Sequence, residues 1–128
     1  MNIRLMDGLP FITATIEYRG RRATFPWVLL DTGSAGCIFP TDKLLMIDLR
    51  YEPDDTVHRI RGVGGAEFVF TKKVDQLGLD ELQVADFEIE VGAMEYGFEM
   101  DGIIGMDFLL KTGAVIDLPY LEIRKSSS

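Results

Sequence analysis

Apolar and polar side chains alternate in several short segments of this chain, and this period of two restricts the fold more than any other feature. Residues 12–19 read Ile-Thr-Ala-Thr-Ile-Glu-Tyr-Arg, and residues 86–91 read Asp-Phe-Glu-Ile-Glu-Val. Successive side chains of a strand point to opposite faces, so the pattern indicates strands with one buried face. Further strands are predicted from Ala23 towards Asp31 and at residues 57–61, 67–75, 114–118 and 121–124.

Helical signals are weak by comparison. Residues 41–46 predict one short helical turn, and residues 106–111 predict another that ends at Gly113. Many short strands separated by glycine are typical of a barrel or a sandwich. The chain has 128 residues, of which 47% are hydrophobic, enough for one folded domain. We therefore expect a single all-β domain over residues 1–128 with one or two short helices and a flexible tail at 125–128.

Charge and residue content argue against several classes of function. The formal net charge is -8, whereas a nucleic-acid partner requires a basic face. Cys37 is the only cysteine and His58 the only histidine, which leaves no disulfide within the chain and no metal-binding cluster. Residues 1–7 lack the apolar core of a signal peptide, and no apolar run approaches the ~20 residues of a membrane helix. We expect a cytoplasmic protein without cofactor, metal, nucleic-acid partner or membrane partner.

An acidic residue at the end of an apolar strand, Asp31, is the leading candidate for chemistry. Residues 27–30 are Trp-Val-Leu-Leu, and the chain continues Asp31-Thr32-Gly33-Ser34. A carboxylate at that place needs hydrogen-bond donors, which a backbone turn at Gly33 and the hydroxyls of Thr32 and Ser34 can supply. These residues leave two interpretations open: Asp31 caps a turn, or it is a catalytic carboxylate.

Two further segments help to distinguish these interpretations. One is rich in glycine and lies between two predicted strands, and the other is an apolar strand directly before the second predicted helix. They consist of Gly62, Val63, Gly64 and Gly65, and of Ile103, Ile104 and Gly105. In this order and spacing, together with the Asp31 loop, they resemble the retropepsin family, the single-domain aspartic proteases of retroviruses and of their cellular and bacterial relatives. The resemblance covers residues 10–124 and is closest to the bacterial branch.

The resemblance implies a role for each residue of the Asp31 loop. Asp31 would be the catalytic carboxylate, and Thr32 would brace the loop by bonding across to a partner loop. Gly33 would allow the tight turn and offer its N–H, and Ser34 would donate to the outer carboxylate oxygen. Just past the loop, Cys37 is expected to be a buried, unreactive thiol rather than a redox switch, because a reactive thiol needs nearby positive charge.

The resemblance also implies what surrounds the loop. Ile103-Ile104-Gly105 would pack behind it, with Gly105 leaving room for close approach of the backbone. Residues 62–65 would form the tip of a mobile flap over the substrate. The implied fold is the closed acid-protease barrel.

A single Asp-Thr-Gly motif implies a dimer. The reaction of this family needs two carboxylates that share a proton, one to activate a water and the other to polarise the scissile carbonyl. Asp31 is the only acid in that motif, so the second carboxylate would come from another copy across a two-fold axis. We expect a homodimeric aspartic endopeptidase that cleaves an extended polypeptide.

Two departures from the viral pattern support an alternative. Residues 34–38 carry no acid, and Met106-Asp107 stand where viral enzymes place an arginine, so the ion-pair brace between these positions is missing. Asp107 is expected instead to cap the helix that follows. The alternative is a catalytically weak or inactive retropepsin-like domain that acts as a dimerisation or peptide-binding module.

Overall fold

Strands make up most of the structure. The computed structural model describes residues 1–62, 65–94 and 99–126. The described strands are β1 (Arg4–Met6), β2 (Leu9–Tyr18), β3 (Arg21–Leu30), β4 (Ile38–Pro40), β5 (Val57–Gly62), β6 (Gly65–Leu79), β7 (Leu82–Gly92), β8 (Gly102–Ile104), β9 (Ala114–Asp117) and β10 (Glu122–Lys125). The described helices are α1 (Thr41–Leu44), which continues into the 3₁₀ turn η1 (Leu45–Ile47), and α2 (Met106–Thr112). The prediction of a mostly β chain with short helices is confirmed.

The predicted elements end at residues suited to turns. Arg19 and Gly20, with φ of 49° and 81°, form the turn between β2 and β3, a pair that suits a tight hairpin. Helix α2 ends at Gly113, whose φ is 64° and whose N–H bonds to two carbonyls of the last turn. β6 and β7 are longer than the predicted strands because buried Leu79 and Leu82 carry the alternating pattern up to their connecting turn.

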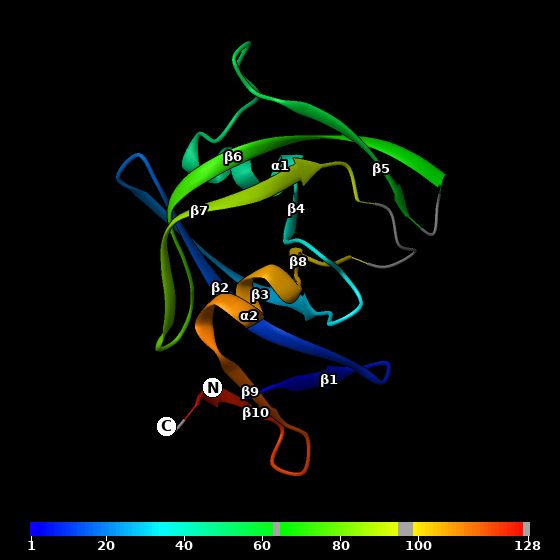
Figure 1. Cartoon of the computed structure of the whole chain (residues 1–128), viewed down its shortest axis with the longest axis vertical. Coiled ribbons are helices and arrows are strands. Elements are labelled where there is room, and N and C mark those ends of the chain that lie inside the picture. The colour runs from blue at the N-terminus through cyan, green and yellow to red at the C-terminus, as the bar shows by residue number, and fades with distance from the viewer. Residues whose placement is uncertain (63–64, 95–98, 127–128) are drawn as a thin grey trace.

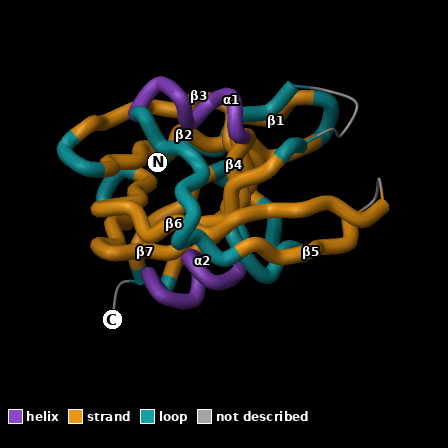
Figure 2. Tube along the Cα trace, turned by 90° about the horizontal axis from the view of Figure 1, so that it is seen from above, coloured by secondary structure: helices purple, strands orange, loops and turns teal. Residues whose placement is uncertain are grey.

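One sheet of eight strands encloses the core. Its order is β1-β2-β3-β8-β4-β7-β6-β5, and an additional pairing joins β2 to β6. The strands β2, β3, β8, β4, β7 and β6 therefore form a continuous series in which the last strand pairs with the first. Strands β6 and β7 curve over the interior (Figure 1). Figure 2 shows α1 and α2 on opposite sides of the strands. The largest fully buried side chains are Phe11, Phe25, Phe39 and Phe108.

The Asp31 loop begins where β3 ends, and β3 is held in place by a parallel neighbour. Leu29 pairs with Ile103 and Leu30 with Ile104, so β8 lies beside the last residues of β3. A parallel pair of consecutive strands would need a long crossover. Here β3 and β8 are separated by the whole of β4 to β7, which supplies that crossover.

The chain ends form a second, small sheet. β9 and β10 pair with each other, as the predicted strands at 114–118 and 121–124 suggested, and Asn2 bridges to Glu122. Backbone bonds of 2.7 Å from Ile3 N–H to the Leu121 carbonyl and 2.9 Å from Ile123 N–H to the Met1 carbonyl extend this pairing. Lys125, which was expected to belong to a flexible tail, is instead the last residue of β10.

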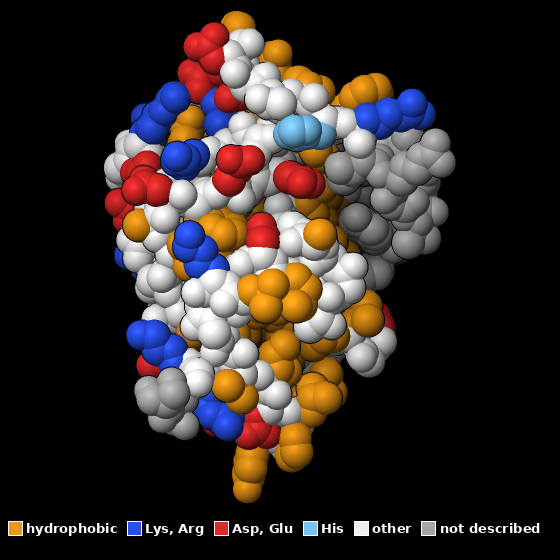
Figure 3. Space-filling view, in the orientation of Figure 1, with side chains coloured by type: hydrophobic (Ala, Val, Ile, Leu, Met, Phe, Trp, Pro, Cys, Tyr) orange, Lys and Arg blue, Asp and Glu red, His pale blue; other side chains and the backbone are white. Residues whose placement is uncertain are grey.

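The outer surface carries exposed apolar side chains as well as charges. Figure 3 shows hydrophobic side chains over α2 and at the end of the molecule that β9 and β10 form, where Leu110, Leu118 and Tyr120 are exposed. His58 is also exposed, on β5. Among the described residues, no helix has the length and apolar character needed to cross a membrane.

Candidate active site

Asp31 is held at the end of the β3–β8 ladder. Its N–H donates to the Ile104 carbonyl at 3.0 Å, so the parallel pairing continues one residue beyond β3. The Gly33 N–H donates to Asp31 Oδ1 at 2.9 Å, the bond expected of Gly33, and the Ser34 N–H donates to the Asp31 carbonyl at 3.1 Å. Asp31 is half-buried, whereas Thr32 and Gly33 are exposed. The loop therefore fixes the carboxylate by backbone contacts and leaves one face of the site open.

Ser34 differs from the expected arrangement. Its hydroxyl donates to the Gly36 carbonyl at 2.8 Å, not to the carboxylate of Asp31. A hydroxyl carries one proton, and the turn at residues 34–36 brings the Gly36 carbonyl within its reach. In this single chain the side-chain bond of Ser34 stabilises the turn that leads away from Asp31.

The loop also completes the start of helix α2. The Ser34 carbonyl accepts from the Met106 N–H at 2.8 Å, and the Ala35 carbonyl accepts from the Asp107 N–H at 3.1 Å. The first N–H groups of a helix have no partner within the helix, so these two carbonyls satisfy groups that would otherwise be unpaired. The expected cap by Asp107 is wrong: Gly105 is the N-cap, no side chain caps it, and Asp107 lies in the first turn.

Gly105 lets the loop and the β8–α2 corner approach closely, as expected. A Cβ atom there would lie 2.2 Å from the Gly36 carbonyl oxygen and 2.7 Å from the Ser34 carbonyl oxygen. Both atoms belong to the backbone and cannot move aside as a flexible side chain would. The same approach brings the two carbonyls to the start of α2, so the shape of the loop depends on the absence of a side chain at Gly105.

Cys37 and Asp107 make a link that the sequence did not reveal. The Cys37 thiol donates to Asp107 Oδ1 at 3.3 Å and accepts from the Gly105 N–H at 3.4 Å. Asp107 Oδ1 also accepts from the Phe108 N–H at 2.7 Å. Burial raises the pKa of the Cys37 thiol, which keeps it protonated and able to donate, in agreement with the predicted unreactive thiol.

A second acid, Glu90 on β7, lies beside the same loop. Its N–H donates to the Cys37 carbonyl at 2.9 Å, and its Oε1 lies 3.5 Å from the place where a Cβ on Gly36 would be. Burial raises the pKa of Glu90, the charges of Asp107 and Glu88 add to the increase, and His58 opposes it. The alternation at residues 86–91 placed Glu90 on the polar face of a strand, but alternation does not show which loop covers that face.

The two isoleucines behind the loop belong to different apolar clusters. Ile104 packs in the main core, whereas Ile103 packs with Phe11, Ile38, Val69 and Met100. Val69 comes from β6, so the second cluster joins the strand beside Asp31 to the long β5–β6 hairpin. Partly buried Met6, Leu9, Leu29 and Met94 surround this cluster.

The predicted flap falls at the end of the β5–β6 hairpin. Gly62, the last residue of β5, pairs with Gly65, the first residue of β6. Val63 and Gly64 lie outside the described residues, so the flap prediction for them stays a prediction.

The geometry thus joins Asp31, Gly33, Ser34, Ile104 and Gly105 in one tight corner, with the carboxylate of Asp31 at its open face. Among the described residues, no group of three or more metal-binding side chains is present. A comparison with curated proteins finds no match. A protein-family model described as aspartyl protease matches residues 12–108, which is most of the chain. The chain therefore belongs to this aspartyl protease family, which is part of the retropepsin-like clan.

Proposed function

We propose that the protein is an aspartic endopeptidase whose working unit is a homodimer with one Asp31 from each subunit. The observation that carries the proposal is the position of Asp31: a half-buried carboxylate held by Gly33, at the open face of a loop in a chain of the aspartyl protease family. The chain has one Asp-Thr-Gly motif, and the chemistry needs two carboxylates. Thr32 is exposed next to Asp31, where a second loop can contact it.

The proposed reaction uses the two carboxylates in different states. The pair shares one proton, because two ionised carboxylates at such a distance repel each other. The ionised carboxylate takes a proton from a water, and the protonated one donates to the scissile carbonyl oxygen. The water attacks the carbonyl carbon to give a tetrahedral diol, and proton transfer to the nitrogen then releases the amine. The Gly33 N–H, 2.9 Å from Asp31 Oδ1, holds the carboxylate in place during these transfers.

The proposed substrate is an extended polypeptide. The β5–β6 hairpin reaches over the second apolar cluster through Val69, and extended chains bind by pairing with such strands while side chains enter apolar pockets. We also propose that the returning ladder of β2, β3, β8, β4, β7 and β6 is the closed barrel of this clan. The barrel would then supply a rigid support for the loop.

Replacement of Asp31 tests the catalytic assignment. Asp31→Asn is expected to lower the cleavage rate of an unfolded protein by about 100- to 10,000-fold across pH 4 to 7, the usual contribution of a general acid–base group. Asp86→Asn is the matched control, because Asp86 is exposed with a φ of 51° that asparagine adopts readily. Cleavage that survives Asp31→Asn would refute the assignment.

Mixing the two forms tests the dimer. An excess of Asp31→Asn subunits should exchange into wild-type dimers and reduce their activity, because a mixed dimer has only one carboxylate. A mass measurement in solution should give twice the mass of the chain. Full activity from a species of single-chain mass would contradict the shared site, and a dimer without cleavage by wild type would support the binding module instead.

A further inference from the structure

Lys72, in the middle of β6, is the one charged or polar side chain that is buried among those the structure describes. Only 5% of it is exposed. An ammonium group loses its hydration when it is buried, so it needs ionised partners in close contact. Its Nζ lies 2.5 Å from Glu52 Oε1 and 2.9 Å from Asp55 Oδ2. Lys72, Glu52 and Asp55 take no part in the proposed catalytic steps.

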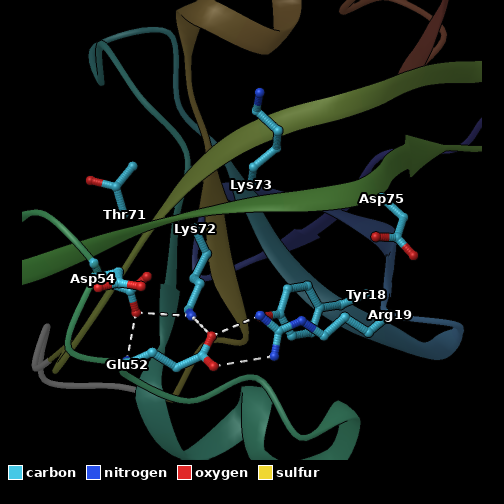
Figure 4. Close-up of a pocket in the computed structure, with 9 residues that line it drawn as sticks. Tyr18, Arg19, Glu52, Asp54, Thr71, Lys72, Lys73 and Asp75 are labelled. Carbon is cyan, nitrogen blue, oxygen red and sulfur yellow. Dashed lines mark hydrogen bonds and ion pairs between the residues drawn. The ribbon is translucent and has the colours of Figure 1, made fainter.

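Both acids lie in residues 48–56, the segment that connects η1 to β5. Asp55 Oδ2 also accepts from the Glu52 N–H at 2.7 Å, and the Asp55 N–H donates to the Glu52 carbonyl at 2.9 Å. These two bonds fold residues 52–55 into a turn from which Glu52 and Asp55 pair with Lys72, and Figure 4 shows the Glu52 side chain reaching towards it. The turn is therefore docked onto β6 by one buried ammonium.

A second cation joins the cluster from the turn between β2 and β3. Arg19 lies 2.8 Å from Glu52 Oε1, and its guanidinium and the Lys72 ammonium both lie near the ring of Tyr18, at 4.8 and 5.9 Å. Hydrogen bonds from Lys72 and then Arg19 lower the pKa of Glu52 to about 2. Burial alone would lower the pKa of Lys72, but its bonds to Glu52 and Asp55 outweigh burial and raise it. Lys72, Glu52 and Arg19 therefore remain charged at neutral pH.

This cluster lies where the edge strand β5 begins. Among the described strands, β5 pairs only with β6, so its position depends on that pairing and on the segment that leads into it. Next to the cluster, the Thr71 N–H donates to the Thr56 carbonyl at 3.1 Å, and Tyr51 packs edge-on against Phe70 at 5.5 Å. The Lys72 cluster, defined as Lys72, Glu52, Asp55 and Arg19, thus fixes the base of the β5–β6 hairpin.

The same hairpin reaches the candidate active site. Val69 precedes Lys72 by three residues and points to the other face of β6, where it packs with Ile38 and Ile103. Ile103 pairs with Leu29, two residues before Asp31. One face of this part of β6 is therefore docked by the ion pairs, and the other contacts the apolar cluster behind Asp31.

We propose that Lys72 is a positioning residue for the polypeptide substrate: through Glu52 and Asp55 it holds the base of the β5–β6 hairpin, and so the hairpin, over the Asp31 site. The proposal rests on the proposed function for its kinetic consequence, and on the structure alone for its effect on β5. Removal of the ammonium leaves two neighbouring carboxylates that repel each other, so the turn at residues 52–55 separates from β6 and β5 loses its anchor.

Hydrogen exchange tests the effect on β5 without any assumption about catalysis. Lys72→Met keeps the length and apolar stem of the side chain and removes its charge. We expect about tenfold faster amide exchange in residues 57–62 and unchanged exchange in β2 and β3. Lys73→Met is the matched control, because Lys73 points away from the cluster on the opposite side of β6 (Figure 4) and should exchange like wild type. Equal exchange in both variants, or acceleration throughout the chain, would overturn the proposal.

Kinetics then test the consequence for the substrate. At a temperature where circular dichroism shows every variant folded, Lys72→Met should raise KM for a long peptide severalfold while kcat stays within about twofold of wild type. A purely structural role would instead reduce the active fraction, and so kcat, with KM unchanged, and that result would overturn the proposal. If wild type cleaves nothing, the proposed function fails and the exchange experiment still decides the role of Lys72 at β5.

Discussion

Two connecting segments, the Asp31 loop and residues 48–56, are held against the sheet by different kinds of contact. The loop is fixed by backbone bonds to Ile104, Met106 and Asp107 and by the close approach at Gly105. Residues 48–56 are fixed by the side-chain charges of the Lys72 cluster, with three ion-pair contacts of 2.5 to 2.9 Å around Glu52 and Asp55.

These contacts predict how each segment responds to a change of pH and to substitution. Backbone bonds carry no titratable group, so the bonds that join the loop to Ile104, Met106 and Asp107 do not depend on pH, whereas Gly105 leaves no space for an added atom. Ion pairs depend on ionisation, so the base of the β5–β6 hairpin responds to pH and to charge substitutions. A loop fixed by its backbone beside a hairpin held by charges would suit the proposed endopeptidase, which has to admit a long substrate.

The largest expected effect comes from filling the space at Gly105. Gly105→Ala places a Cβ 2.2 Å from a backbone oxygen, so the loop has to move and the free energy of unfolding should fall by about 3 kcal/mol, the upper part of the range for overpacking. Gly36→Ala is the control in the same loop, because its Cβ would meet only ordinary contacts at 3.5 Å or more. Urea unfolding measures the free energy of unfolding of both variants. Equal losses would show that the close approach at Gly105 does not determine the stability of the loop.

A smaller effect is expected when the carboxylate behind the loop is removed. Asp107→Ala leaves the Cys37 thiol and the Phe108 N–H without their acceptor, which should cost about 2 kcal/mol of unfolding free energy. Asp107→Asn keeps an oxygen that can accept both bonds and should lose much less. If the two variants unfold at the same urea concentration, the charge of Asp107 rather than its hydrogen bonds stabilises the corner.

The smallest expected effect is a pH dependence of the free energy of unfolding that arises from Glu52. It distinguishes the two regions most directly. The pKa of Glu52 falls from 4.5 to about 2 on folding, so its ion pairs stabilise the protein above pH 4.5 and this stabilisation is lost as the pH falls towards 2. Glu52→Gln should therefore be less stable than wild type at neutral pH, and the difference should shrink over that interval. Parallel stability curves for the two proteins across this pH range would contradict the role of Glu52.

Local patterns were sufficient to predict many of the elements. The alternation at residues 12–19 and 86–91 predicted strands because the two faces of a strand meet different environments, whichever strands are its neighbours. Gly113 marked the end of a helix for a similar local reason, since it adopts a positive φ. The helical turns at 41–46 and 106–111 were likewise predicted within a residue or two of their observed bounds.

The contacts that fix the site were not predictable in this way. Cys37 and Asp107 are 70 residues apart, and their bond exists only because β8 lies beside both β3 and β4. The hydroxyl of Ser34 was assigned to the wrong acceptor, because the path of the loop past Gly36 depends on the corner against which it packs. The alternation at residues 68–74 could have identified the buried lysine. Lys72 shares a strand face with Phe70 and Val74, both buried, whereas its neighbour Lys73 lies on the opposite face.

The sequence by itself determined that this chain is mostly strand and that Asp31 lies in an Asp-Thr-Gly loop followed by the motifs of its family, because these properties depend on residues that are neighbours in the chain. Only the tertiary structure decided which groups hold Asp31 and which hold β5. Those choices depend on strand order and register, which bring Gly105 to Gly36 and Lys72 to Glu52 and Asp55 from distant parts of the chain.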